Sequence, residues 1–481
     1  ALSCLNADWT GTNSNDARST VKCSTSNGHK ADRSNANDQD SVAELNASQL
    51  NCVEAGWNHV GKDAGVCWIH ALWHVSKVAV CVVYVEVLGE DAVLEVMRSG
   101  WLTTGKHSLK FEKDFSDFMN GSSEMEENRK TLGLDARKVE SLAVNSNTSG
   151  MILAMEALGV GHGKAVITTP YTFVSTASSA VHLGAEVLFA DTEKDSYSID
   201  PEKIREILEN DRKTKNKVAA IVPVHIAGNL CDMKKILEIA REYDVKVIED
   251  AAHSFPSPTP IGYAGTIGDA GVFSFYVTKT ITTAEGGMVS CRNPEVLKRM
   301  KTMRLHGMDR ETWDRYTSPK ASWEYDIVAP GYKFNLPDVL SAIGVCQLKK
   351  AELFFEKRKR IVEKYNSEFK NLDFIRLPPD GEGNAWHLYL IRINPETLRI
   401  GRDDFARELQ KKGIGISVHF IPLFHFSYWR ALNPDFTKEN YPNAENNYRN
   451  TISLPLWPDM TDKMIDEVVD AVIRTGKENH V

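Results

Sequence analysis

The stretch that decides the fold reads Val245-Lys246-Val247-Ile248-Glu249-Asp250-Ala251-Ala252-His253. Its apolar run predicts a buried strand that carries the carboxylate of Asp250 at its carboxyl end, where open α/β sheets build their sites. A second apolar strand, over residues 271–279, brings the amine of Lys279 back to the same edge. An amine and a carboxylate in one cleft suit pyridoxal phosphate, because the lysine bonds to the aldehyde and the aspartate keeps the ring nitrogen protonated.

The sequence after Lys279 strengthens this interpretation. An ordinary surface lysine and a strand-end aspartate that caps a loop would look the same in isolation, and short motifs often mislead. Here Lys279 is followed by a polar turn over residues 280–285 and by the pair Gly286-Gly287, which leads into another apolar strand. Two adjacent glycines allow a close backbone approach to a ligand or a tight reversal. The setting therefore favours a cofactor site.

Short apolar strands alternate with helical segments from about residue 140, and this pattern predicts an α/β fold with a mostly parallel sheet flanked by helices. Strands are expected at residues 165–168, 186–190, 218–224, 245–250, 271–276 and 287–290, and helices at 149–158, 174–183, 201–209, 233–243 and 294–304. After about residue 380, a smaller α+β domain is expected, with strands at 386–393 and 416–420 and helices at 403–412 and 462–474.

The composition is that of a globular enzyme. With 481 residues, of which 42% are hydrophobic and 25% charged, the chain can bury a large core and should hold more than one domain. A formal net charge of −8 leaves no basic footprint, so no nucleic acid partner is expected.

The first 85 residues differ from the rest. Residues 1–49 are rich in Ser, Asn, Asp and Thr, which predicts a disordered or poorly packed extension. Five of the eight cysteines fall in this part, without a CxxC pair or a His/Cys spacing, so neither a metal site nor a disulfide module is expected. We interpret them as incidental thiols; they are Cys4, Cys23, Cys52, Cys67 and Cys81.

Residues 66–85 form the one stretch that suggests a membrane span. Because it carries His70, His74 and Lys77 in its middle, a helix followed by a strand at 80–85 is the preferred interpretation. No secretory signal stands at the start of the sequence, so a cytoplasmic protein is expected.

Several motifs occur in the order found in one known family. They are Arg98–Gly105 (RSGWLTTG), Pro170–Thr176 (PYTFVST), Glu249–His253, the Lys279 strand, Gly331–Asn335 (GYKFN), Ala385–Tyr389 (AWHLY), Gly415–Phe420 (GISVHF) and Ser453–Leu456 (SLPL). On these residues the chain resembles the DegT/DnrJ/StrS sugar-nucleotide aminotransferases, which use pyridoxal phosphate, from about residue 90 to 474. The resemblance implies the fold type I transferase fold, with an extension at 1–85, a cofactor-binding domain at 86–380 and a small domain at 381–481.

The stretch Asn145-Ser146-Asn147-Thr148-Ser149-Gly150-Met151 matches the phosphate-binding helix start of this family. Amide groups and the helix dipole attract an anion there, although a simple N-cap has the same composition. The resemblance implies that Thr148 and Ser149 contact the phosphate, while Asn147 stands where relatives more often have glycine, which leaves the backbone geometry at that position open.

The resemblance also implies roles for residues that alone would suggest a packed core. Phe173 stands where relatives stack an aromatic ring on the pyridine, and Ser274 matches a phosphate-binding serine. His253 is expected to bond the phenolic oxygen of the cofactor or to orient Asp250, and a satisfied buried histidine is the alternative.

The loop that carries Lys333 crosses to the neighbouring subunit in this family and touches its phosphate. The resemblance therefore implies a homodimer with two shared sites, in which Lys333 acts as a point charge. His306, His419 and Tyr428 match positions near the sugar nucleotide, and each could equally be a structural residue.

By resemblance, the chain takes an amino group from an amino acid, expected to be glutamate, and passes it to a nucleotide-linked keto sugar for cell-surface polysaccharide or secondary-metabolite glycans. Dehydratase relatives replace the anchoring lysine, typically with histidine, and Lys279 argues against that route. A cofactor- or sugar-binding sensor remains an alternative, because Thr280 departs from the usual asparagine.

Aromatic residues at 310–325 and 424–441, including Trp313, Tyr316, Trp323 and Trp429, are expected either to stack on the base or to pack.

Overall fold

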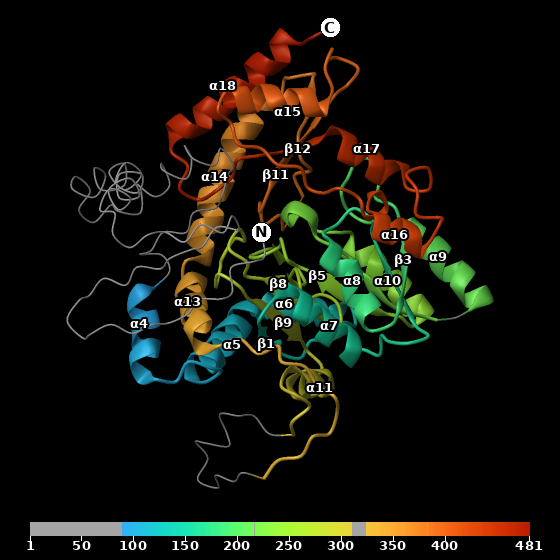
Figure 1. Cartoon of the computed structure of the whole chain (residues 1–481), viewed down its shortest axis with the longest axis vertical. Helices are drawn as coiled ribbons and strands as arrows, with labels where there is room; N and C mark the ends of the chain where they lie inside the picture. The colour runs from blue at the N-terminus through green and yellow to red at the C-terminus, as the bar shows by residue number, and fades with distance from the viewer. Residues whose placement is uncertain (1–88, 216, 310–323, 382) are drawn as a thin grey trace, which may run out of the picture. The chain divides into compact units, whose positions relative to one another are not determined.

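The computed structural model describes residues 89–215, 217–309, 324–381 and 383–481 (Figure 1). The predicted extension at 1–85, with its helix and strand at 66–85, lies outside the described residues. So do Trp313, Tyr316 and Trp323. Within the described ranges, no helix is both long and apolar enough to cross a membrane.

The central sheet has seven strands in the order β1-β9-β8-β5-β4-β2-β3. Strands β3, β2, β4, β5 and β8 run parallel, whereas β9 is antiparallel to both of its neighbours. The predicted mostly parallel α/β fold is thus confirmed. The strands are β1 (Glu140–Val144), β2 (Ala165–Thr168), β3 (Glu186–Phe189), β4 (Val218–Val222), β5 (Lys246–Asp250), β8 (Ala270–Ser274) and β9 (Gly287–Cys291).

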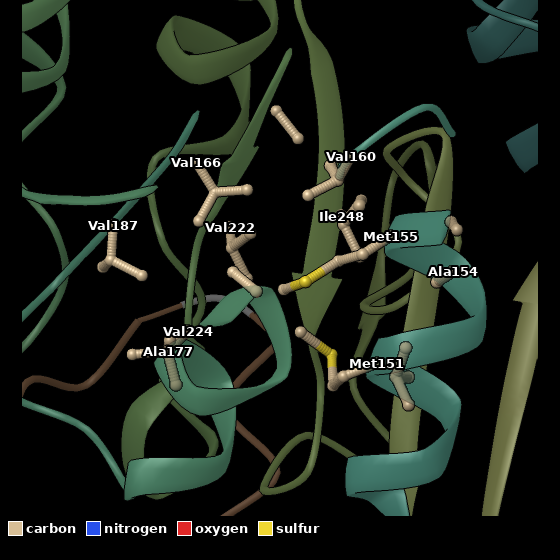
Figure 2. Packing of buried hydrophobic residues seen from close by; sticks show 14 of the residues in the cluster. Met151, Ala154, Met155, Val160, Val166, Ala177, Val187, Val222, Val224 and Ile248 are labelled. Carbon is tan, nitrogen blue, oxygen red and sulfur yellow. The ribbon is translucent and has the colours of Figure 1, made fainter. Parts of the chain in front are cut away.

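Helices cover both faces of the sheet because successive strand residues point to opposite sides. On one face, Met151 and Met155 pack with Val222 and Ile248 (Figure 2). This face is covered by α7 (Asn147–Ala157), α8 (Val174–His182) and α11 (Pro294–Arg304). The other face is covered by α5 (Lys106–Met119), α9 (Pro201–Thr214), α10 (Met233–Tyr243) and α13 (Asp338–Leu348).

The C-terminal part forms a second core around a three-stranded antiparallel sheet in the order β10-β11-β12. Its elements are β10 (Ile375–Arg376), β11 (Tyr389–Ile393), β12 (Thr451–Leu454), α15 (Arg402–Lys411) and α18 (Asp462–Glu478). It is the smaller α+β unit that the sequence predicts.

Helix α14 (Ala351–Phe369) runs from the large core to the small one (Figure 1). Phe354 belongs to the core under the large sheet, whereas Ile361 and Phe369 belong to the small core. Three ion pairs join α14 to Asp459 before α18 and to the first two turns of α18, each worth about 0.2–1 kcal/mol at such exposure. They are Lys357–Asp459, Arg360–Asp462 and Lys364–Asp466.

The remaining elements are short helices and one hairpin. They are α4 (Glu90–Ser99), α6 (Ser123–Thr131), η1 (Ile226–Gly228), the hairpin β6 (Pro258–Thr259) and β7 (Gly262–Tyr263), η2 (Leu423–His425), α16 (Ser427–Leu432) and α17 (Pro442–Asn450).

Two expectations from the sequence are wrong in detail. No strand forms at 416–420, where a single bridge joins Ser417 to Ser453 and the hydroxyl of Tyr171 donates a hydrogen bond to the carbonyl of His419. Strand β8 ends at Ser274, so Lys279 lies in a turn and its amide donates to the carbonyl of Tyr276.

Candidate active site

A cavity of about 690 Å³ opens where β5 and β8 end. Its floor comes from the sheet edge and the starts of α7 and α8, and its opposite wall comes from the C-terminal part. The lining residues lie at 146–148, 172–175, 250–253, 274–279, 387–388, 415–420 and 453–457, with Val224, Glu285 and Gly286. Ligands of open α/β proteins bind at such carboxyl ends of strands.

Asp250 is a buried carboxylate at the end of β5. The hydroxyl of Thr176 donates to its Oδ2 at 2.7 Å, and the amide of Ala252 donates to its Oδ1 at 3.2 Å. Burial raises the pKa of Asp250, while these two donors and the charge of Lys279 oppose that rise. The carboxylate is therefore arranged to meet a cation inside the cavity.

Lys279 provides the amine on the same cavity wall. Burial lowers the pKa of Lys279 from its ordinary value of 10.5 to about 8, and the negative charge of Asp250 opposes the change. An amine with this pKa is partly unprotonated near neutral pH, so it can act both as a nucleophile and as a proton carrier.

The start of α7 lies beside this pair and is built to receive an anion. Ser146 caps the helix by accepting from the amide of Ser149 at 3.1 Å, and Asn147 and Thr148 of the first turn line the cavity. Asn147 adopts ordinary helical geometry, so the departure from glycine needs no left-handed backbone. A Cβ on Gly287 would lie 2.8 Å from the Asn147 amide nitrogen, so glycine lets β9 approach this turn.

His253 has a defined tautomer. Its Nδ1 accepts from the main-chain amide of Ala227 at 3.1 Å, and an amide nitrogen can only donate. Burial and the nearby positive charge of Lys279 hold the pKa of His253 well below its ordinary value. The neutral ring therefore carries its proton on Nε2, which is a hydrogen-bond donor.

Seven of the residues predicted from the sequence line one cavity. They are Thr148, Phe173, Asp250, His253, Ser274, Lys279 and His419. Phe173 exposes 59% of its surface, so its ring is available to stack on a ligand. Nδ1 of His419 lies 2.7 Å from the hydroxyl of Ser453, which orients its ring.

Four predicted residues lie away from the cavity lining. Ser149 is the nearest, but its hydroxyl donates to Asn145 at 2.6 Å and contacts Ser146. His306 is exposed with a φ of 57°, and Tyr428 is exposed on α16. Lys333 is exposed beyond the cavity. Its predicted role depends on a second subunit.

The structure separates the aromatic residues of the segment at 424–441. Trp429 is buried and packs 5.8 Å from Phe189, so it belongs to the core and cannot stack on a base. Tyr428 is the exposed member of the pair.

Sequence reasoning did not assign roles to Thr176 and His387, which the structure brings to the site. Thr176 lies in the quoted motif at 170–176, and its position three residues after Phe173 in a helix start was the available signal. His387 lies in the motif at 385–389 and lines the cavity.

These residues fit pyridoxal phosphate. Asp250 suits a pyridinium nitrogen, Lys279 an aldehyde, the start of α7 with Ser274 a phosphate, and Phe173 the face of the ring. The fold and the site together define a pyridoxal phosphate-dependent transferase of fold type I.

Comparison with known proteins gives the family. Residues 87–473 match the DegT/DnrJ/EryC1/StrS aminotransferase family, and the chain belongs to it. The spore coat polysaccharide biosynthesis protein SpsC of Bacillus subtilis (strain 168) is 36% identical over 383 residues, which are 79% of this chain and 92% of SpsC. An uncharacterized protein of Methanocaldococcus jannaschii is 41% identical over 397 residues, which are 82% of this chain and 96% of that protein.

Solved structures agree with this assignment. The Streptococcus pneumoniae protein Spr1654 in its pyridoxamine phosphate form is 27% identical with a TM-score of 0.72, covering 82% of this chain and 98% of that one. Spr1654 is also known in its pyridoxal phosphate form. Helicobacter pylori PseC, an aminotransferase involved in the biosynthesis of pseudoaminic acid, is 27% identical with a TM-score of 0.69, covering 81% and 96%.

Replacing Thr176 by valine should weaken cofactor binding. The substitution removes a donor that lowers the pKa of Asp250, so the carboxyl takes up a proton at a higher pH. We expect affinity for pyridoxal phosphate near neutral pH to fall about tenfold, with a smaller loss at higher pH. Absorbance titration checks this. Thr172→Val, one hydrogen bond further away, should have a smaller effect, and equal affinities for all three proteins would contradict the account.

Capture of pyridoxal phosphate by the cofactor-free protein should accelerate as pH rises through about 8 and then level off. The unprotonated amine of Lys279 is the attacking form, and its pKa is about 8. Stopped-flow absorbance measures the rate. In Asp250→Asn the midpoint should move to lower pH, because the charge that raises the pKa of Lys279 is gone. A rate that does not change over roughly pH 7 to 9 would contradict this prediction.

Proposed function

We propose that the protein transfers an amino group from an amino acid, glutamate in our proposal, to a keto sugar carried on a nucleotide. The observation that carries this proposal is the pairing of the Lys279 amine with the Asp250 carboxylate in one cavity of a chain that belongs to an aminotransferase family. Relatives that act in polysaccharide and pseudoaminic acid biosynthesis support a sugar acceptor. The product would be an amino sugar for a cell-surface polysaccharide or another glycan.

When bound, pyridoxal phosphate supplies an aldehyde that takes up the amino group and a pyridinium ring that acts as an electron sink. Asp250 would hold the proton at the ring nitrogen, and hydrogen bonds from Thr176 and Ala252 favour its ionised form. Because Nδ1 of His253 accepts from the Ala227 amide, its Nε2–H is the nitrogen that would donate a hydrogen bond to an oxygen of the cofactor.

Lys279 moves the proton that the exchange of amino groups requires. Its Nζ takes a proton from the α-carbon of the amino donor and later returns one to the sugar carbon. A pKa of about 8 suits this work, because the group can both accept and release a proton near neutral pH. The apolar residues of the opposite wall, such as Leu388, Leu454 and Phe420, keep water away from the amine.

Two other functions receive less support. A dehydratase of the same family would need the lysine to be replaced, and Lys279 is present with a suitable pKa. A non-catalytic sensor was suggested by Thr280, but Thr280 is outside the residues that line the cavity. Turnover with a keto sugar separates an enzyme from a sensor.

We place the reaction in the cytoplasm. The three cysteines of the described residues, Cys231, Cys291 and Cys346, are free thiols, which is the usual state in a reducing compartment.

We further propose an isologous homodimer with shared sites. Lys333 is exposed and lies beyond the cavity of its own chain, so it is available to a phosphate held by a second subunit. Partial burial and the nearby charge of Arg304 lower the pKa of Lys333, as expected for a cation that lacks an anionic neighbour.

A panel of nucleoside diphosphate keto hexoses tests the reaction. We expect wild-type protein with glutamate to convert at least one of them, and Lys279→Ala to lose at least about a thousandfold in kcat while keeping its circular dichroism spectrum. Chromatography of the amino sugar product measures the conversion. Lys246→Ala, an exposed lysine on β5, is the control and should stay active. Conversion by Lys279→Ala at the wild-type rate would contradict the mechanism.

Mixing two inactive variants tests the shared sites. Lys333→Glu should bind pyridoxal phosphate weakly through repulsion of the phosphate, and Lys279→Ala should not turn over. Mixed dimers contain one site with both wild-type lysines, so activity should return after subunit exchange. Turnover before and after mixing is the measurement, and no recovery in proven mixed dimers would exclude the shared arrangement.

A further inference from the structure

His387 stands out among the residues of the cavity wall. It is 5% exposed and lines the cavity, yet its Nδ1 has no hydrogen-bond partner among the described residues. A buried polar group without a partner costs about 1–3 kcal/mol. Most such groups in folded proteins are satisfied, so each exception calls for a physical reason.

Hydrogen bonds and close packing fix the backbone at His387. Its amide donates to the carbonyl of Ala227 at 2.9 Å, and its carbonyl accepts from the guanidinium of Arg358 at 3.2 Å. Trp386 before it has a φ of 48°, and Gly228 packs against the Trp386 amide so closely that a Cβ would lie 2.9 Å away. The segment is thus fixed from both sides.

The neighbouring ring does not satisfy His387 either. The centroid of the His387 ring lies 4.4 Å from that of the His253 ring, at an interplanar angle of 47°. Nδ1 of His253 is occupied by the amide of Ala227, so it cannot accept from His387. A molecule bound in the cavity that His387 lines would supply a partner.

The charge state of His387 indicates which chemical group it suits. Burial, together with His253 and the cation of Lys279, holds the pKa of His387 well below its ordinary value, so the ring is neutral. A neutral imidazole offers one donor and one acceptor, which matches a hydroxyl group. Carboxylates are bound better by charged donors such as guanidinium groups.

We propose that His387 determines sugar specificity by hydrogen-bonding a ring hydroxyl of the keto sugar, and that it does not recognise the amino donor. This inference rests on the proposed function, because it assigns a residue to the acceptor half of that reaction. His387 lines the same cavity as Asp250 and Lys279, so a sugar that reacts at Lys279 occupies the cavity that His387 lines.

The two half-reactions can be measured separately by stopped-flow absorbance. Purified wild-type protein is first mixed with glutamate alone, and then the aminated protein is mixed with the keto sugar that the wild type converts fastest. His387→Phe keeps a ring against His253 but cannot hydrogen-bond, and His387→Gln keeps a donor and an acceptor. His162→Phe, an exposed histidine outside the cavity, is the control.

We expect His387→Phe to lower kcat/KM of the sugar half-reaction about 10- to 100-fold and to leave the glutamate half-reaction within about twofold. His387→Gln should recover part of the loss. Deoxy analogues of the sugar, each lacking one ring hydroxyl, identify the hydroxyl that His387 contacts. With the analogue that lacks this hydroxyl, wild type and His387→Phe should react equally slowly, because neither can form the hydrogen bond. The affinity for a nucleotide-linked hexose without a keto group, measured by calorimetry, should fall from wild type to His387→Gln to His387→Phe.

Three outcomes overturn the assignment. The first is unchanged kinetics of the sugar half-reaction in His387→Phe. The second is an equal loss in both half-reactions, which would indicate a structural role. The third is that no deoxy analogue removes the difference between His387→Phe and wild type. If the wild type converts no keto sugar of the panel, the proposed function falls and this inference falls with it. Normal wild-type turnover with unaffected variants removes the inference alone.

Discussion

A carboxylate and an amine, both withdrawn from water and facing one cavity, form the constraint on which the rest of the structure depends. Burial opposes the charged form of each group, and the opposite charge of the other group favours it. Thr176 and the Ala252 amide favour ionised Asp250, whereas burial lowers the pKa of Lys279 to about 8 against the opposing charge of Asp250. The sheet supplies the geometry, because β5 and β8 are neighbours and end at the same edge.

Much of this arrangement can be predicted from the sequence, because hydrophobic periodicity and helix caps are local properties. Helices α10 and α11 have the predicted bounds, and strand β2 does as well. The cofactor residues that could be named are those at strand ends and helix starts, where topology forces them together. Helix α14, in contrast, has no counterpart among the predicted helices.

The features that the sequence did not predict correctly depend on contacts between segments that are distant in the chain. The strand expected at 416–420 does not form, because Tyr171 takes the carbonyl of His419 and only Ser417 pairs with its neighbour. His387 gave no signal of its own, since its setting depends on Ala227 and Arg358, which lie 160 and 29 positions away in the chain. Such long-range hydrogen bonds leave no periodic trace in a sequence.

Helix α14 has a consequence for how the protein unfolds. The N-terminal end of this helix packs in the core of the seven-stranded sheet, and its C-terminal end packs in the core of the three-stranded sheet. Loss of either core therefore releases a structural member of the other, and this links the stabilities of the two domains. The molecule should melt as one cooperative body, although its topology divides into two.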